Sequence, residues 1–585
     1  MRVKTSFQII IVMLVIQMTI HAQPRFIDQT AAYQIAHSYG SGMSGGGVSL
    51  CDFNGDGKDD ISLGSSSGHV IQFYENTGES MQRLDLLSGL KEEIKSLLWA
   101  DLDNDGDKDL FVCVFGGHNR LFENKGNLDL HDITVQSGIS LDPYSSFGAC
   151  IGDYNRDGLL DIYVSQRRVQ TDGLPNRSLL YRNDGHLTFT DVSFNAGAED
   201  GGKTPFCSAF VDVNNDKWPD LYTAHDRERG NSLLINNTDG TFSSEGFNFN
   251  ADLKMDGMSV STADVNFDGF MDIYVSNSTD GNALFVNKNG TRFENESTER
   301  GVSFNGVAWG TNFLDGDNDG DDDLYVSSML VGKNNITSTY YSNEYPSKVF
   351  SKGEQVPSDT VSSFNNAVGD LNSDGYPDIV VSNAEFPTTV FENRGGDHHY
   401  LAISLQGVMS NRDGIGSLVS VYSQGKRITK YTQCGIGFLG QNSNQLLFGL
   451  NNVNAADSIE VLWPTGHIDR YRFVAGNTSY VLVEGGSTAG KIDVDEGLIL
   501  SNIEQKIVTR LKLSPNPANT YCTLDIPVSQ IREIHVIDVT GKEVMHKRNP
   551  NQNEINVESL PAGSYWLQCI LQTGVVYCTS IIIQK

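Results

Sequence analysis

The stretch DYNRDGLLDIYVSQ, residues 153–166, decides the fold of this chain, because its pattern recurs seven times. Each copy reads Asp-x-Asn/Asp-x-Asp-Gly-x-x-Asp followed by Ile or Leu, and one copy has Lys in place of Gly. The copies begin at Asp52, Asp101, Asp153, Asp212, Asp264, Asp315 and Asp370, at intervals of 49 to 59 residues. A fixed period of this length is typical of repeat architectures in which each unit is one small supersecondary element.

The residues after each loop have the composition of short strands. The runs DIYVSN from Asp272 and DLYVSS from Asp323 are rich in β-branched and aromatic residues. A second turn follows, as in NALFVNKNG (Asn282–Gly290), and then a Phe-led segment such as FENESTERGV (Phe293–Val302). A unit of about 50 residues with about four short strands is the size of a propeller blade. The sequence therefore predicts an all-β chain that begins with a seven-bladed β-propeller.

The two ends of the repeat region predict how the ring closes. After the seventh loop the chain runs through PTTVFENRGG (Pro387–Gly396) and then changes texture without a further Phe-led strand. A matching segment, FIDQTAA (Phe26–Ala32), stands before the first loop instead. We expect this strand to pair near Phe391 and complete the last blade, which would remove the open edges of the ring.

The spacing within each loop predicts a calcium site. Calcium takes six to eight oxygen ligands, and alternate side chains of a tight loop can converge on one ion. Positions one, three, five and nine would supply side chains, and position seven a backbone carbonyl. Position six is Gly in six copies, which allows a backbone turn that most residues avoid. The predicted ligands are Asp52, Asn54, Asp56, Lys58 and Asp60; Asp101, Asp103, Asp105, Asp107 and Asp109; Asp153, Asn155, Asp157, Leu159 and Asp161; Asp212, Asn214, Asp216, Trp218 and Asp220; Asp264, Asn266, Asp268, Phe270 and Asp272; Asp315, Asp317, Asp319, Asp321 and Asp323; and Asp370, Asn372, Asp374, Tyr376 and Asp378.

Two alternatives to strand-linked calcium loops fit the pattern less well. An EF-hand begins with the same pattern, but it needs an acidic residue at position twelve and flanking helices, whereas that position is Leu63 in the first copy. Solvated Asp turns without metal are the other alternative, and they do not explain seven copies with three or four acids each. Lys217 replaces the loop Gly in the fourth copy, so we expect that site to hold calcium least well.

Charge and the N-terminal residues indicate where the protein acts. The chain has 73 acidic and 42 basic residues, a formal charge of −31, which disfavours nucleic acid as a partner. Arg2 and Lys4 precede an apolar run (Phe7–Ile16), and Ile20-His21-Ala22 is a weak cleavage site, so residues 1–22 are predicted to be a signal peptide. A membrane anchor there is the less favoured alternative. We expect no transmembrane segment after signal removal.

The repeats resemble the FG-GAP and VCBS-like repeats that also build the propellers of integrin α chains. The resemblance covers about residues 26–395, and seven copies fit the seven-bladed version. It implies a propeller domain over residues 23–396 with up to seven structural Ca²⁺ ions.

A second module follows the propeller. The elements NRDGIGSLVSV (Asn411–Val421), CGIGFLGQ (Cys434–Gln441) and IEVLWPTG (Ile459–Gly466) resemble the ASPIC/UnbV domain of the cartilage acidic protein family. We assign it residues 397–485 and expect a small β-sandwich. Asn411 and Arg412 could bind a ligand or hold a turn, and Trp463 could be core or a sugar platform; the turn and the core are favoured.

The last module identifies an export route. Residues 486–510 have no clear period and are predicted to be a linker. Residues 511–585, with Pro515-Asn516-Pro517 and Gly563-Ser564-Tyr565, resemble the C-terminal sorting domain of the type IX secretion system, a second small β-sandwich-like domain. The resemblance implies a Bacteroidetes-type host, interaction with the type IX secretion machinery, and a secreted or outer-membrane-attached protein.

No catalytic signature is present, so we expect a binding protein rather than an enzyme. The chain lacks a Gly-x-Ser-x-Gly elbow, HExxH, a P-loop and a Rossmann fingerprint. The favoured function is adhesion to an extracellular protein or glycan ligand, with residues 166–176 (including Arg167 and Arg168) and 331–357 as candidate binding surfaces. The alternative is an extracellular polysaccharide-degrading lyase or hydrolase built on the propeller.

Overall fold

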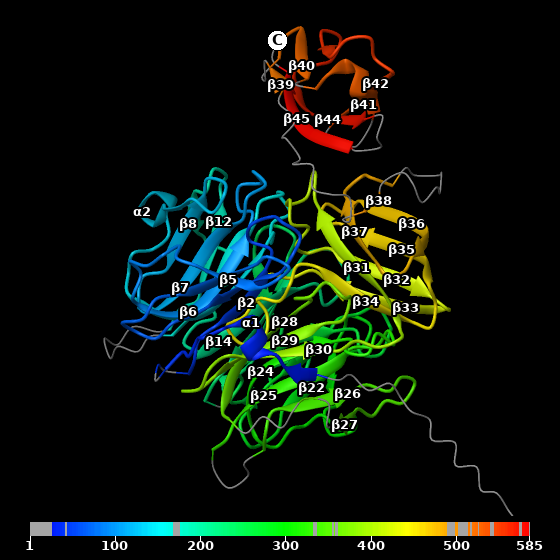
Figure 1. The fold of residues 1–585 in the computed structure, drawn as a ribbon. Coiled ribbons are helices and arrows are strands. Elements are labelled where there is room, and N and C mark those ends of the chain that lie inside the picture. The colour runs from blue at the N-terminus through cyan, green and yellow to red at the C-terminus, as the bar shows by residue number, and fades with distance from the viewer. Residues whose placement is uncertain are drawn as a thin grey trace, which may run out of the picture.

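Each repeat folds into a blade of four antiparallel strands, and seven blades form the propeller (Figure 1). The computed structural model describes residues 26–583 apart from 41, 43, 168–175, 228, 332–335, 354–355, 357–360, 488–497, 501–512, 515–517, 525, 539–542 and 572–575. The proposed signal peptide and residue Arg168 therefore lie outside the described residues. Within the described residues no helix is both long and apolar enough to cross a bilayer.

The strands of blades one to four follow the chain order from the central channel outward. Blade one has β2 (Val48–Cys51), β3 (Asp60–Leu63), β4 (Gln72–Asn76) and β5 (Met81–Leu84); blade two has β6 (Glu93–Ala100), β7 (Asp109–Gly117), β8 (Arg120–Asn124) and β9 (Leu130–Asp132), followed by α2 (Thr134–Ser137); blade three has β10 (Tyr144–Gly152), β11 (Asp161–Arg167), β12 (Leu179–Asn183) and β13 (Phe189–Asp191); and blade four has β14 (Pro205–Val211), β15 (Asp220–His225), β17 (Ser232–Asn236) and β18 (Phe242–Ser244), with a small ribbon of β16 (Arg229–Gly230) and β19 (Lys254–Met255).

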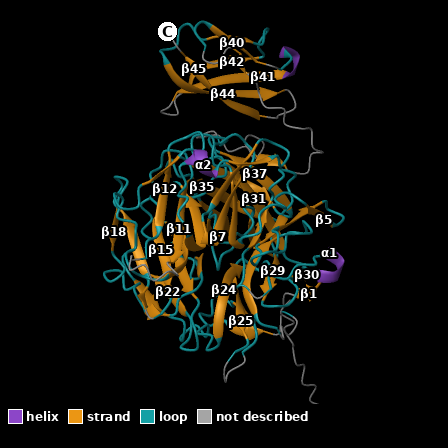
Figure 2. Cartoon of the chain, turned by 90° about the vertical axis from the view of Figure 1, so that its left-hand side faces the viewer, coloured by secondary structure: helices purple, strands orange, loops and turns teal. Residues whose placement is uncertain are grey.

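Blades five to seven repeat the arrangement. Blade five has β20 (Val260–Ala263), β21 (Asp272–Val275), β22 (Ala283–Asn287) and β23 (Phe293–Asn295); blade six has β24 (Val307–Leu314), β25 (Asp323–Met329), β26 (Thr339–Ser342) and β27 (Ser351–Gly353); and blade seven has β28 (Ser363–Gly369), β29 (Asp378–Asn383), β30 (Thr389–Asn393) and β1 (Phe26–Asp28). In Figure 2 strands joined by loops make up nearly all of the drawn chain, and helices are short.

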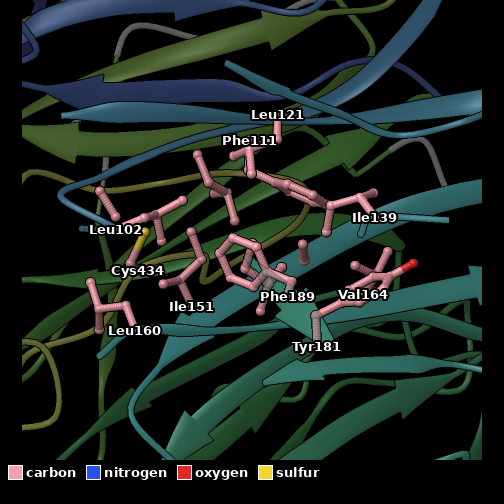
Figure 3. Close-up of a cluster of buried hydrophobic side chains, with 14 of the residues drawn as sticks. Leu102, Phe111, Leu121, Ile139, Ile151, Leu160, Val164, Tyr181, Phe189 and Cys434 are labelled. Atoms are coloured by element: carbon pink, nitrogen blue, oxygen red, sulfur yellow. The ribbon is translucent and has the colours of Figure 1, made fainter. Parts of the chain in front are cut away.

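The strand after each Asp loop begins with two or three mainly apolar residues after its Asp because both of its faces are buried. In β11, Ile162 and Val164 pack toward blade two, whereas Tyr163 between them packs toward blade four. The core between blades two and three is seen in Figure 3, where Phe111 and Phe189 lie in one cluster. Alternate side chains therefore join successive blades, and the cores between blades hold the ring together.

The N-terminal strand closes the ring, which confirms the predicted pairing. Phe26 lies opposite Asn393 and Asp28 opposite Phe391, so β1 is the outer strand of blade seven. The strand is shorter than the predicted 26–32. It stops because the Asp28 carboxylate accepts the N–H of Thr30 at 3.0 Å, where the one-turn helix α1 (Thr30–Tyr33) begins.

A sandwich module follows the propeller. Its two four-stranded sheets have the orders β34-β31-β37-β38 and β33-β32-β35-β36. The strands are β31 (His399–Gln406), β32 (Leu418–Ser423), β33 (Lys426–Tyr431), β34 (Leu446–Asn451), β35 (Ala455–Leu462), β36 (Ile468–Ala475), β37 (Thr478–Val483) and β38 (Leu498–Leu500). β38 lies in the segment predicted to be a linker, and it pairs with β37 at the sheet edge.

A tail module is the last part of the chain. Its sheets have the orders β39-β40-β43 and β42-β41-β44-β45, which is again a small two-sheet arrangement. The elements are β39 (Leu513–Ser514), β40 (Tyr521–Leu524), η1 (Val528–Gln530), β41 (Ile531–Asp538), β42 (Glu543–Arg548), β43 (Glu554–Asn556), β44 (Gly563–Leu571) and β45 (Val576–Ile583).

Candidate metal centres

All seven Asp loops lie within the described residues and share one hydrogen-bond pattern. In the first loop the Asp52 carboxylate accepts the N–H groups of Asp56 and Gly57 at 2.9 and 2.8 Å. Asn54 also accepts the N–H of Asp56, and Asp56 accepts the N–H of Lys58 at 3.0 Å. The side chains at positions one, three and five therefore turn back into the loop and bind its backbone.

The position-seven residues have their N–H groups fixed in the same way. In every loop this N–H donates to the position-five carboxylate, at 2.8 to 3.0 Å. The donors are Lys58, Asp107, Leu159, Trp218, Phe270, Asp321 and Tyr376. This repeated bond fixes the backbone at the position whose carbonyl was predicted to be a ligand.

Two positions in each loop adopt left-handed backbone conformations. Position six has a φ between +76° and +104°, and Lys217 takes this conformation with φ +76°. Its N–H donates to Asp212 at 2.7 Å, as the Gly N–H does in the other loops, so the fourth loop keeps the common shape at the cost of backbone strain. Position four is also left-handed in all seven loops, a requirement that the sequence analysis missed; its residues are Gly55, Asn104, Arg156, Asn215, Phe267, Asn318 and Ser373.

The position-nine carboxylates are buried at the base of the loops. In blade five, Asp272 is fully buried and accepts the N–H of Val265 at 3.0 Å and the N–H of Asn287 at 2.6 Å. The same pair of bonds recurs in every blade. The position-nine Asp therefore ties its loop to the third strand of its own blade.

The third-strand asparagines also connect neighbouring blades, a role that the sequence analysis did not identify. Asn287 donates through Nδ2 to the carbonyl of Val213 in the blade-four loop at 2.8 Å. Four other members of the set reach the preceding blade in the same way, at 2.7 to 2.8 Å. The set is Asn76, Asn124, Asn183, Asn236, Asn287, Asn343 and Asn393. The signal was available, because every repeat carries this Asn before its second turn.

The loops are electrostatically unfavourable without a cation. Burial, and neighbouring carboxylates such as Asp157, raise the pKa of Asp153 to about 7. The pKa of Asp264 and of Asp370 is likewise raised to about 7, chiefly by burial. Buried carboxylates in one loop resist ionisation together unless a positive charge compensates them.

The donor set fits a hard divalent cation such as calcium. In the second loop one carboxylate oxygen each of Asp101, Asp103 and Asp109 lies within 4.8 Å of the others. In the sixth loop the same holds for Asp315, Asp317 and Asp319. Oxygen-only donors with carboxylates at alternate positions are the ligands that calcium prefers. The second loop thus brings positions one, three and nine together, and the sixth loop positions one, three and five.

The sandwich module lies against the loop side of the propeller. Asp413 accepts the N–H of Asp101 at 2.9 Å and pairs with Lys108 at 2.7 Å. Arg156 in the third loop donates to the carbonyl of Pro464 at 2.6 Å. No contact between this module and the propeller was predicted, yet the module packs on the side of the propeller that carries the Asp loops.

A segment of the sandwich module enters the central channel of the propeller. This plug segment (residues 433–443) makes bridges to the first strands of blades one, three and five. Gln441 is fully buried, accepts the N–H of Trp99 at 2.8 Å and donates to its carbonyl at 2.9 Å. Phe438, also fully buried, packs in a cluster with Phe206 and Trp309. The channel is therefore filled by the chain itself.

The candidate binding residues outside the loops have structural roles. Arg167, predicted to lie on a binding surface, is instead part of β11, where it pairs with Asp226 at 2.7 Å and its guanidinium lies 4.3 Å from the centre of the Phe206 ring. Residues 331–357 include the outer strands of blade six rather than one long loop. The side-chain amide of Asn411 holds a turn, because it accepts the N–H of Ile415 and donates to the carbonyl of Ile415. Trp463 is fully buried, so the turn and the core, the two favoured alternatives, are what the structure has.

Comparison with known families follows this division of the chain. A model described as FG-GAP-like repeat matches residues 52–112, 101–164 and 212–275, and one described as FG-GAP repeat matches 365–397. The propeller is built of FG-GAP repeats. A model described as ASPIC and UnbV matches residues 407–489 of the sandwich module. The tail module matches a model described as secretion system C-terminal sorting domain over residues 512–584. This domain directs the protein by type IX secretion to the cell surface or exterior.

Curated relatives and solved structures are similar to parts of this chain. Cartilage acidic protein 1 of Homo sapiens is 28% identical over 151 residues, 24% of this chain and 22% of the relative. The Xenopus tropicalis protein of the same name is 28% identical over 24% of this chain and 23% of its own. An Agrocybe aegerita protein described as recognising non-reducing terminal N-acetylglucosamine aligns with TM-score 0.40, 18% identity and coverage of 63% of this chain and 94% of its own. The Dos1 propeller aligns with TM-score 0.38 and 11% identity over 64% and 95% of the two chains.

Proposed function

We propose that this protein is an extracellular binding protein whose FG-GAP propeller is held together by up to seven structural Ca²⁺ ions. The observation that carries the proposal is the repeated loop, in which the position-nine carboxylate is buried in all seven blades and the position-one carboxylate in six of them. The ligand of the whole protein would be an extracellular protein or a glycan. The sorting domain supports the extracellular setting, where calcium is abundant.

The calcium role follows from the chain's own residues. When bound, calcium would neutralise the loop carboxylates and supply a hard cation for their oxygens. The residues that would hold it in blade five are Asp264, Asn266, Asp268, Asp272 and the carbonyl of Phe270. Because Asp272 also binds Asn287, and Asn287 reaches the blade-four loop, each ion would stabilise the contact between two blades.

The position of the sandwich module restricts where an external ligand can bind. The channel and much of the loop face are occupied by the chain's own residues, so the free surface is the perimeter and the opposite face. Three large apolar side chains stand at equivalent places on the perimeter of blades two, three and four: Val135, Phe194 and Phe247 are 75%, 78% and 83% exposed. Exposed apolar side chains at repeated positions support a binding role.

The experiment is a glycan array run in parallel with a reducing-end release assay, both on the calcium-loaded full chain. Saturable binding without release of reducing ends supports the binding function. A variant with Phe194→Ser and Phe247→Ser tests the perimeter and should weaken binding at unchanged melting temperature. Release of reducing ends from any polysaccharide would contradict the proposal and favour a degrading enzyme.

A further inference from the structure

The sandwich module contacts several Asp loops, and the loop of blade six is the one that it covers most completely. Residues 315–323 include no exposed residue, whereas each of the other loops, all of them within the described chain, has at least one. Asp315, Asp321 and Asp323 are 2–3% exposed and Asn318 is fully buried. In the first loop, by contrast, a Cβ added at Gly55 or Gly57 would meet nothing within 4 Å.

The cover is the sandwich module. The N–H of Gly449 donates to the carboxylate of Asp315 at 3.1 Å, and the N–H of Asn451 donates to the carbonyl of Asn318 at 2.8 Å. Lys430 pairs with Asp322 at 2.5 Å. These contacts come from β33 and β34, which are edge strands of the two sheets, so one edge of the sandwich lies directly on the loop.

The fit between Gly449 and the loop leaves no spare room. A Cβ on Gly449 would lie 2.2 Å from Oδ2 of Asp315 and 2.4 Å from the carbonyl carbon of Asn318. Distances under 3.0 Å require one of the groups to move. Backbone and carboxylate are therefore in direct contact at Gly449, and Ala at this position would push the module away from the loop.

The covered loop also contains polar atoms that lack a partner. Among the residues that the structure describes, nothing hydrogen-bonds to Oδ1 of Asn318 or to Oδ1 of Asp321. Both side chains are at least nine-tenths buried. Carboxylate oxygens of Asp315, Asp317 and Asp319 gather within 4.8 Å of one another in the same loop. Clustered carboxylates and a buried carboxylate oxygen without a donor are the environment that a cation would compensate.

We propose that the calcium ion of blade six is sealed in by the sandwich module and leaves only when that module moves away. The inference rests on the proposed calcium function and goes beyond it, because it assigns the ASPIC and UnbV domain the role of a gate for one site. The ions of the other loops, which reach solvent, leave directly. Calcium release from the chain then has two kinetic classes, with one ion per chain in the slow class.

The test is calcium release from the loaded full chain after mixing with excess chelator, followed by a fluorescent calcium indicator. The wild-type chain should lose most of its ions quickly and one per chain in a phase at least tenfold slower. Gly449→Ala, which forces the module off Asp315, should speed the slow phase at least tenfold. Gly201→Ala is the control, since Gly201, like Gly449, has no left-handed φ and a Cβ there meets nothing within 4 Å.

The outcomes separate this inference from the calcium function itself. A chain that binds no calcium contradicts the proposed function. A chain that binds calcium but releases all of it in one fast phase contradicts only the seal, as does a slow phase that Gly449→Ala leaves unchanged. If Gly449→Ala does not fold, as judged by gel filtration, Lys430→Ala replaces it and should speed the slow phase at least threefold; an unchanged rate there overturns the seal.

Discussion

Phe438→Ala tests whether the plug segment is part of the structural core of the propeller. Phe438 is fully buried, and its ring lies 5.8 Å from Phe206 and 5.0 Å from Trp309, both in edge-to-face geometry. Phe-to-Ala changes in well-packed cores lower the free energy of unfolding by about 3–5 kcal/mol, because the lost transfer energy adds to that of the cavity. The rings around Phe438 come from several blades and cannot close the cavity by a small shift. We therefore expect about 4 kcal/mol.

The assay is urea unfolding of the calcium-loaded full chain, with tryptophan fluorescence as the signal because Trp309 lies in the cluster. The control is Phe473→Ala in the same module, where the side chain is 73% exposed and the expected change is within about 0.5 kcal/mol. If Phe438→Ala lowers the free energy of unfolding by less than about 1 kcal/mol, or by no more than the control does, the plug segment is not part of the structural core.

Three further predictions follow from the loops. Asn287→Ala removes the bonds to Val213 and Met271 and should destabilise the chain by about 1–3 kcal/mol in urea unfolding, against a negligible change for the exposed Asn248→Ala; equal effects would contradict the blade-to-blade role. Lys217→Gly relieves the left-handed strain, so thermal unfolding should show a gain of about 0.5–1 kcal/mol and calcium titration a tighter blade-four site; a loss of stability would refute the strain. In chelator, the carboxyl groups with pKa raised to about 7 (at residues 153, 264 and 370) contribute stability below pH 4 that is lost as the pH rises through 7. The melting temperature of the metal-free chain should therefore fall from pH 5 to pH 8, and the protection by calcium should grow; a metal-free melting temperature that rises with pH would contradict this.

The blades and their closure could be predicted because their signals are local. Each loop carries its own spacing of acids, and the strand after it is apolar because both faces are buried. The closing strand could be predicted because a Phe-led segment, which begins at Phe26, precedes the first Asp loop and is missing after the last. Its end was less predictable, since the side chain of Asp28 competes for the backbone of Thr30 and stops the strand.

The contacts between modules could not be predicted because they depend on surfaces that no local pattern describes. The plug segment has neither strand nor helix periodicity, and its glycines and Phe438 are meaningful only inside the channel. The cover over blade six depends on Gly449 meeting Asp315, which lies 134 residues earlier in the chain. The third-strand asparagines are an intermediate case, because their repetition is visible in the sequence but their donation to the preceding blade is not.

The most direct test of the account is the calcium content of the purified full chain, measured by atomic emission after gel filtration in calcium-containing and then chelator-treated buffer. The account predicts about seven calcium ions per chain before chelation, one for each Asp loop, with a large fall in melting temperature after it. Fewer than one ion per chain, together with a melting curve that chelator does not change, would contradict the claim that calcium holds the seven loops.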